Sequence, residues 1–157
     1  MILEAMRSYP NVTAAIIFTL ISIPISVCDL RSLKIPDFLN ILLFLLLLAH
    51  RFFFSCGDFI LYLACSICSL LLFYLVRRIS RMGLGWGDIK YSPSCALASG
   101  IWCFPAFLAS SLFCALYFFI VKLKNKSVKT EKAPFAPFMA LGTITLCSIP
   151  IVQDLLN

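Results

Sequence analysis

The sequence has little charge, since Asp, Glu, Lys and Arg make up 13% of its 157 residues. Soluble domains carry about a quarter of their residues charged, and so few polar groups cannot cover a surface in water. A soluble globular protein is therefore excluded. Apolar residues make up 62% of the chain, and the mean hydropathy is +1.01. We expect an all-α, polytopic transmembrane bundle that forms a single domain over residues 1–157 and has the lipid bilayer as its solvent.

The chain also lacks the pattern of a metal site. It has eight cysteines, but nearly all lie in or beside apolar runs, where cysteine behaves as a small hydrophobic residue. Cys65 and Cys68 have the spacing of a metal-binding pair, yet neither a second pair nor a nearby histidine accompanies them. We expect no metal and no other cofactor.

Six apolar runs, bounded by charged residues, proline or glycine, predict six helices. A helix needs about 20 residues to span the hydrocarbon layer. The runs cover residues 11–28, 37–49, 58–76, 83–99, 101–121 and 134–153, and the second is short unless it extends through residues 52–54. The fourth run is the weakest, because it contains Asp88, Lys90 and Pro93. A five-helix alternative fuses residues 94–121 into one long tilted helix.

The basic residues predict the orientation in the membrane. A net charge of +6 can indicate nucleic-acid binding, but here the charges gather in short connections, so we expect no nucleic-acid partner. Cytoplasmic loops are enriched in Lys and Arg. The first, third and fifth connections hold most of them. The amino-terminal segment holds only Arg7, the second connection holds only Arg51, and the fourth connection holds none. This alternation predicts odd-numbered loops in the cytoplasm and both termini outside. The enriched connections contain Arg31, Lys34, Arg77, Arg78, Arg81, Lys122, Lys124, Lys126, Lys129 and Lys132.

Two aspartates stand in this apolar setting. Asp29 closes the first predicted helix and Asp88 opens the fourth, so the predicted topology places both carboxylates near the cytoplasmic face. A charge at the membrane centre costs roughly 2.5–3.5 kcal/mol, which makes both residues functional candidates. The glycines before Asp88 would let the backbone approach an extended substrate.

Paired carboxylates in a site of low dielectric constant can share one proton. One then acts as general base on a water, and the other as general acid on the scissile carbonyl or the leaving amine. This is aspartic peptidase chemistry. Two alternatives remain open at this point. The aspartates could have structural roles, with Asp29 paired to Arg31 and Asp88 to Lys90, or they could line an ion pathway.

Three motifs resemble those of the type IV prepilin-like leader peptidases. Asp29-Leu30-Arg31-Ser32-Leu33-Lys34-Ile35-Pro36-Asp37, followed by Asn40, resembles the first signature of that family. Gly83-Leu84-Gly85-Trp86-Gly87-Asp88-Ile89-Lys90 is similar to the second signature, Gly-x-Gly-Asp-x-Lys. Pro134-Phe135-Ala136-Pro137-Phe138 resembles the segment that opens the final helix. The motifs occur in the family's order and span nearly the whole chain.

The resemblance implies an integral membrane aspartic endopeptidase that removes the basic leader from prepilin or pilin-like substrates at the cytoplasmic edge of the membrane. It implies that Asp29 and Asp88 are the catalytic pair. The other motif residues are expected to shape the site or bind substrate: Gly83, Gly85, Gly87, Lys90, Lys34, Pro36, Pro134 and Phe135. Many members carry an additional amino-terminal part with paired cysteines that is linked to methylation. This sequence shows no such part, so we expect no methyltransferase activity.

Some points remain open or have a simpler explanation. A small transporter of protons or cations that uses the same aspartates is the alternative function. The oligomeric state is not predicted. Asp37 is expected to cap the second helix rather than act in catalysis, and His50 is expected to lie at the external interface. Lys90 could influence Asp88, bind substrate or extend toward the membrane surface.

Overall fold

The computed structural model describes residues 9–80, 84–124 and 134–156, and the regular structure in these ranges is helical. The prediction of an all-α bundle is confirmed, because each predicted run corresponds to a helix. The elements are α2 (Pro10–Ser32), α3 (Asp37–Phe54), α4 (Phe59–Ile79), α5 (Trp86–Ser99), the 3-10 turn η1 (Gly100–Trp102), α6 (Cys103–Lys124) and α7 (Ala136–Leu156).

Several helices are long enough to cross a membrane. In the described ranges, the stretches Pro10–Ser32, Asp37–Phe54, Phe59–Ile79 and Trp86–Tyr117 meet the requirements of length and apolarity, and Ala136–Cys147 is a shorter apolar stretch. Large apolar side chains are exposed along these helices, as expected where lipid is the solvent. The chain is therefore a multi-pass membrane protein.

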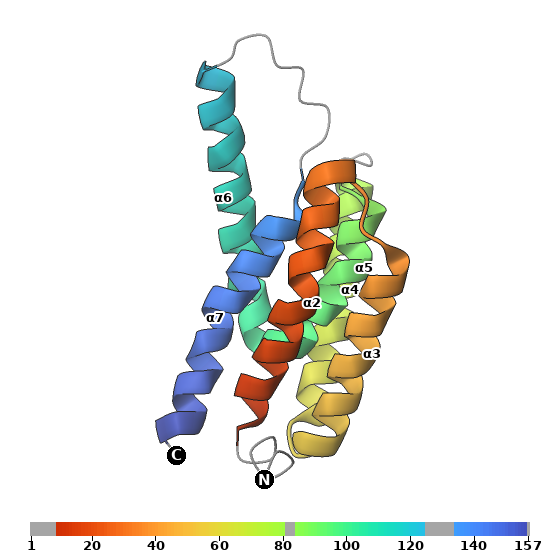
Figure 1. Ribbon diagram of the computed structural model, residues 1–157, viewed down its shortest axis with the longest axis vertical. Coiled ribbons are helices and arrows are strands. Elements are labelled where there is room, and N and C mark those ends of the chain that lie inside the picture. Colours follow the sequence, from red (N-terminus) through yellow and green to blue (C-terminus); the bar gives the residue numbers. More distant parts are fainter. Residues whose placement is uncertain (1–8, 81–83, 125–133, 157) are drawn as a thin grey trace.

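The helical stretch Trp86–Tyr117 does not run straight. It divides at η1, where Gly100 adopts φ +60 and lies against Tyr62 of α4. Figure 1 shows that α5 runs toward the end of the bundle where α2 begins, and that α6 then returns in the opposite direction. The five-helix alternative, with one helix over residues 94–121, is therefore wrong.

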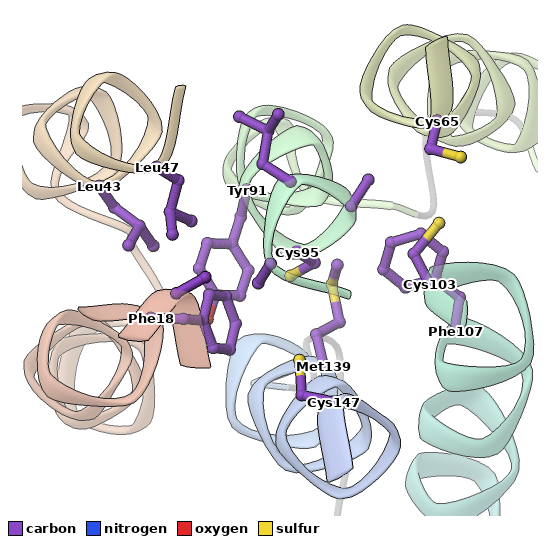
Figure 2. Close-up of a cluster of buried hydrophobic side chains, with 14 of the residues drawn as sticks. Phe18, Leu43, Leu47, Cys65, Tyr91, Cys95, Cys103, Phe107, Met139 and Cys147 are labelled. Atoms are coloured by element: carbon purple, nitrogen blue, oxygen red, sulfur yellow. The ribbon is translucent and has the colours of Figure 1, made fainter. Parts of the chain in front are cut away.

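Helix α5 forms the centre of the bundle. With 14 residues it is only about 21 Å long at 1.5 Å per residue, and every residue from position 91 to 100 is buried. In Figure 2, Tyr91 and Cys95 lie among side chains from α2, α3 and α7. The Tyr91 ring stacks on Phe18 at 6.0 Å between centroids, and its hydroxyl donates to the Ser22 hydroxyl at 2.7 Å. This packing fixes the position of the helix that carries Asp88.

Pro93 lies inside α5 without ending it. Proline has no N–H, so it leaves the carbonyl four residues earlier without its usual helical partner. That carbonyl belongs to Ile89, and the Ser92 hydroxyl donates to it at 3.0 Å. A neighbouring side chain thus replaces the lost backbone bond.

The end of α3 differs from the prediction. The helix continues to Phe54, so Arg51 is part of it rather than of a connection, and its side chain is 0% exposed. The guanidinium donates to the carbonyls of Leu97 and Ala98 at the end of α5, at 2.9 and 2.7 Å, and to the Asn11 side chain at 2.8 Å. Arg51 therefore joins α2, α3 and α5.

His50 is also buried within the bundle, at 4% exposure. Its Nε2 lies 2.7 Å from the Thr13 hydroxyl of α2. Arg51 and His50 both lie near the end of the bundle where α2 begins and α7 ends (Figure 1). The two aspartates lie at the other end.

Candidate functional site

Asp29 is held at the end of α2. It lies in the last turn of this helix and is 6% exposed. Its carboxylate accepts a hydrogen bond from the backbone N–H of Ala136, with a distance of 3.1 Å between Oδ2 and N. Ala136 is the first residue of α7. The amino end of a helix carries a partial positive charge and free N–H groups, both of which favour a carboxylate there.

Helix α2 ends at Ser32, shortly after Asp29, and the chain changes direction at Leu33. The Leu33 N–H donates to the Asp29 carbonyl at 2.9 Å, and Leu33 adopts the left-handed conformation with φ 53. A left-handed residue is a common way to end a helix. This turn directs the connection over residues 33–36 toward α3 and leaves the Asp29 side chain facing the bundle.

Asp88 lies in the first turn of α5 and is 9% exposed. Gly85 precedes the helix as its cap and lies against the Asp88 carboxylate. A methyl group on Gly85 would lie 2.9 Å from Asp88 Oδ2, so a side chain at this position would displace the carboxylate.

The structure brings the two predicted aspartates together. Asp29 and Asp88 come from different helices, yet they are close enough for an appreciable Coulombic interaction between the carboxylates. Both are buried at the same end of the bundle, where a low dielectric constant strengthens the interaction between charges. The Ala136 N–H orients the Asp29 carboxylate, and Gly85 lies against the Asp88 carboxylate. Such a pair can hold one water molecule and exchange a proton through it.

The glycines allow close approach around Asp88. A methyl group on Gly87 would lie 3.1 Å from the Ile35 side chain, so the start of α5 packs directly on the connection over residues 33–36. Pro36 ends this connection as the cap of α3, and Lys34 is exposed on it. Gly83 lies outside the described residues.

Lys90 does not pair with Asp88. Its ammonium group contacts the Asp37 carboxylate at 2.8 Å, and both side chains are more than half exposed. Asp37 is the first residue of α3, and Pro36 rather than Asp37 occupies the cap position. The prediction that Asp37 caps α3 is therefore wrong, since its carboxylate accepts from Lys90 instead. This pair links α3 to α5 at the surface.

The third motif supplies the backbone donor. Pro134 and Phe135 come directly before α7, and the Phe135 carbonyl accepts from the Met139 N–H at 3.1 Å to begin the helix. The Phe135 ring lies 6.5 Å from that of Phe73, which contacts Phe107 at 4.7 Å. Aromatic packing therefore places the start of α7, and with it the Ala136 N–H, beside Asp29.

Two further residues border the site and were not identified as site residues from the sequence. Arg77, counted there only as a basic residue of a connection, lies in α4 with its guanidinium 4.5 Å from the centroid of the Trp86 ring. Cys114 of α6 is near enough to Asp88 to interact with it electrostatically. Among the described residues, no group of His, Cys, Asp and Glu side chains is arranged to hold a metal ion.

The fold and the site define a helical membrane protein with two buried aspartates from separate helices that are close enough to interact electrostatically. The chain belongs to the type IV leader peptidase family, whose sequence model matches residues 16–120. The matched region contains Asp29 and Asp88, whereas the third motif lies beyond it.

A curated relative is similar over most of the chain. It is the prepilin leader peptidase/N-methyltransferase of Bacillus subtilis (strain 168), which is 28% identical over 131 residues, or 83% of this chain and 53% of the relative. The chain thus spans about half the length of that relative. No solved structure matches the chain.

Proposed function

We propose that this protein is an integral membrane aspartic endopeptidase that removes the leader peptide from prepilin-like substrates. One observation carries the proposal: Asp29 and Asp88 are both buried and are close enough to interact electrostatically in a chain of the type IV leader peptidase family. The relative's name, a prepilin leader peptidase, supports the choice of substrate class.

The reaction needs one water and one shared proton. One aspartate takes a proton from the water as the water oxygen attacks the scissile carbonyl carbon. The other, protonated, gives its proton to the carbonyl oxygen, which forms a tetrahedral diol. The first aspartate then gives the proton that it took from the water to the leaving amine, while the second takes back a proton from a hydroxyl of the diol as the species collapses. The peptide C–N bond breaks, and a carboxylic acid and an amine are released. The Ala136 N–H holds the Asp29 carboxylate in place for these transfers, and Gly85 packs against the Asp88 carboxylate.

We place this site at the cytoplasmic face of the cytoplasmic membrane. The end of the bundle that carries Asp29 also carries Arg31 in the last turn of α2 and Arg77 and Arg78 in the last turn of α4. Lys34 is exposed on the connection at this end. Basic residues of this kind favour a cytoplasmic location. The start of α2 and the end of α7 then lie on the outer side.

The proposed activity is limited to peptide hydrolysis. The residues that support it are the two aspartates and the segments that hold them, so the proposal includes no methyl transfer, no cofactor and no nucleic acid. It treats the chain as one peptidase domain. Lys34, Pro36, Gly87 and Lys90 are proposed to shape the surface over which the substrate reaches the aspartates. Gly87 packs against Ile35 of the connection that contains Lys34 and Pro36, and Lys90 pairs with Asp37 at the start of α3.

The proposal is tested by mixing the purified protein in liposomes with candidate prepilins and measuring leader removal by mass. We expect cleavage by the unchanged protein and none by Asp29→Asn or Asp88→Asn. Asp58→Asn is the matched control, because Asp58 is an exposed carboxylate just before α4, at the other end of the bundle. Equal cleavage by Asp88→Asn and the unchanged protein would refute the proposal. Ion flux without cleavage would instead identify the transporter alternative.

A further inference from the structure

Arg77 contacts both residues that flank Gly85. Its guanidinium lies over the Trp86 ring, 4.5 Å from the centroid, and its Nη1 donates to the Leu84 carbonyl. Leu84, Gly85 and Trp86 form the entry to α5, and Gly85 lies against the Asp88 carboxylate, since a methyl group there would be 2.9 Å from Asp88 Oδ2. Arg77 itself belongs to α4, a different helix.

The entry to α5 needs an external support. Glycine restricts the backbone less than any other residue, and this segment has glycine at positions 85 and 87. On one side, Gly87 packs against Ile35. On the α4 side, Arg77 contacts the backbone before Gly85 and the ring after it. These contacts limit the positions that the Gly85 backbone can take beside the Asp88 carboxylate.

We infer that Arg77 is a positioning residue for Asp88, which it orients by holding the Leu84–Gly85–Trp86 backbone against α4. The inference rests on the proposed peptidase function. Arg77 does not touch the reacting atoms, and its effect passes through the backbone at Gly85, which lies against the Asp88 carboxylate.

Arginine suits this role better than lysine. Its guanidinium is planar, so it can stack on an aromatic ring and donate a hydrogen bond from its edge at the same time. A lysine ammonium keeps the positive charge but offers no flat face. Arg77→Lys is therefore expected to keep the orientation in the membrane and to lose part of the support.

The neighbouring Arg78 provides a matched control. It lies in the same last turn of α4 and is exposed, so Arg78→Gln removes the same charge from the same end of the bundle. Any effect of Arg77→Gln that Arg78→Gln lacks cannot come from the altered charge of this connection. If Arg77→Gln accumulates poorly, Arg77→Lys replaces it, because it removes the planar contact and keeps the charge.

The experiment measures kcat and KM for prepilin cleavage and the fluorescence of Trp86. Misplacing a reacting group by about 1 Å can slow a reaction by about 10²-fold, and we expect kcat to fall at least ~10-fold in Arg77→Gln with little change in KM. The kcat of Arg77→Lys should lie between those of Arg77→Gln and the unchanged protein, and the kcat of Arg78→Gln should stay within about 2-fold of that of the unchanged protein. In a Trp102→Phe background, which leaves Trp86 as the remaining tryptophan, Arg77→Gln should increase quenching of Trp86 by acrylamide, and Arg78→Gln should not.

The possible failures can be told apart. If the unchanged protein cleaves and Arg77→Gln has the same kcat as Arg78→Gln, the inference is wrong and the proposed function stands. Unchanged quenching of Trp86 in Arg77→Gln also overturns it, because the stacked contact would then be absent. If the unchanged protein cleaves no prepilin, the proposed function fails and the inference falls with it.

Discussion

The Asp29 carboxylate accepts a hydrogen bond from the backbone N–H of Ala136, a residue 107 positions further along the chain. The bond joins the last turn of α2 to the first residue of α7. It explains what the segment Pro134-Phe135-Ala136 contributes to the site. The Phe135 ring packs on Phe73 of α4, and the Ala136 N–H donates to Asp29.

Ala136→Pro tests this bond. Proline has no N–H but is well tolerated at the first position of a helix, so the variant should still accumulate in the membrane. Loss of one oriented donor at a catalytic site can cost about 10²-fold in rate, and we expect leader removal to slow by at least ~10-fold. Ala136→Gly is the control, because it keeps the N–H. Similar rates for the two variants would show that the bond does not matter for activity.

Gly85→Ala tests the close contact at Asp88. The added methyl group would lie 2.9 Å from Asp88 Oδ2, so the carboxylate must move. A displacement near 1 Å can reduce a rate by about 10²-fold, and we expect kcat to decrease by ~10-fold or more. Gly57→Ala is the matched control, since nothing lies within 4 Å of a methyl group there. The measurement is prepilin cleavage by equal amounts of each folded variant.

Arg51→Lys tests the support at the other end of α5. Lysine cannot reproduce the planar set of donors that bonds Leu97, Ala98 and Asn11. An unpaired buried polar group costs about 1–3 kcal/mol, so we expect the free energy of unfolding to fall by about that amount. Denaturation in mixed micelles measures it, with Arg78→Lys as the control. If both variants unfold alike, the contacts of Arg51 do not stabilise the bundle.

The helices were largely predictable because their ends carry local signals. Asp37 after Pro36 begins α3, and Gly100 ends the helix that starts before Asp88. The end of α3 was predicted too early, because Arg51 looks like a helix boundary in the sequence. Its burial depends on the carbonyls of Leu97 and Ala98, which are far along the chain and leave no trace in local composition.

The candidate site was predictable as far as its side chains are concerned. The two aspartates follow from their apolar surroundings and from the alternation of basic residues, and the structure brings them together. The position of Lys90 could also have been foreseen, since residues two apart on a helix do not face each other. The Ala136 N–H could not, because every residue except proline has an N–H and only the fold shows which one meets Asp29.

The central claim, that positions 29 and 88 meet, is tested most directly by cross-linking. Asp29→Cys and Asp88→Cys are combined in a protein that also carries Cys28→Ala and Cys114→Ala, since these two native thiols lie next to Asp29 and near Asp88. After mild oxidation in the membrane, we expect mass spectrometry to find a peptide that joins positions 29 and 88. The control pair, Asp29→Cys with Asp58→Cys, should give none, because Asp58 lies at the opposite end of the bundle. Absence of the 29–88 peptide from the folded protein that carries both Asp29→Cys and Asp88→Cys would contradict the account.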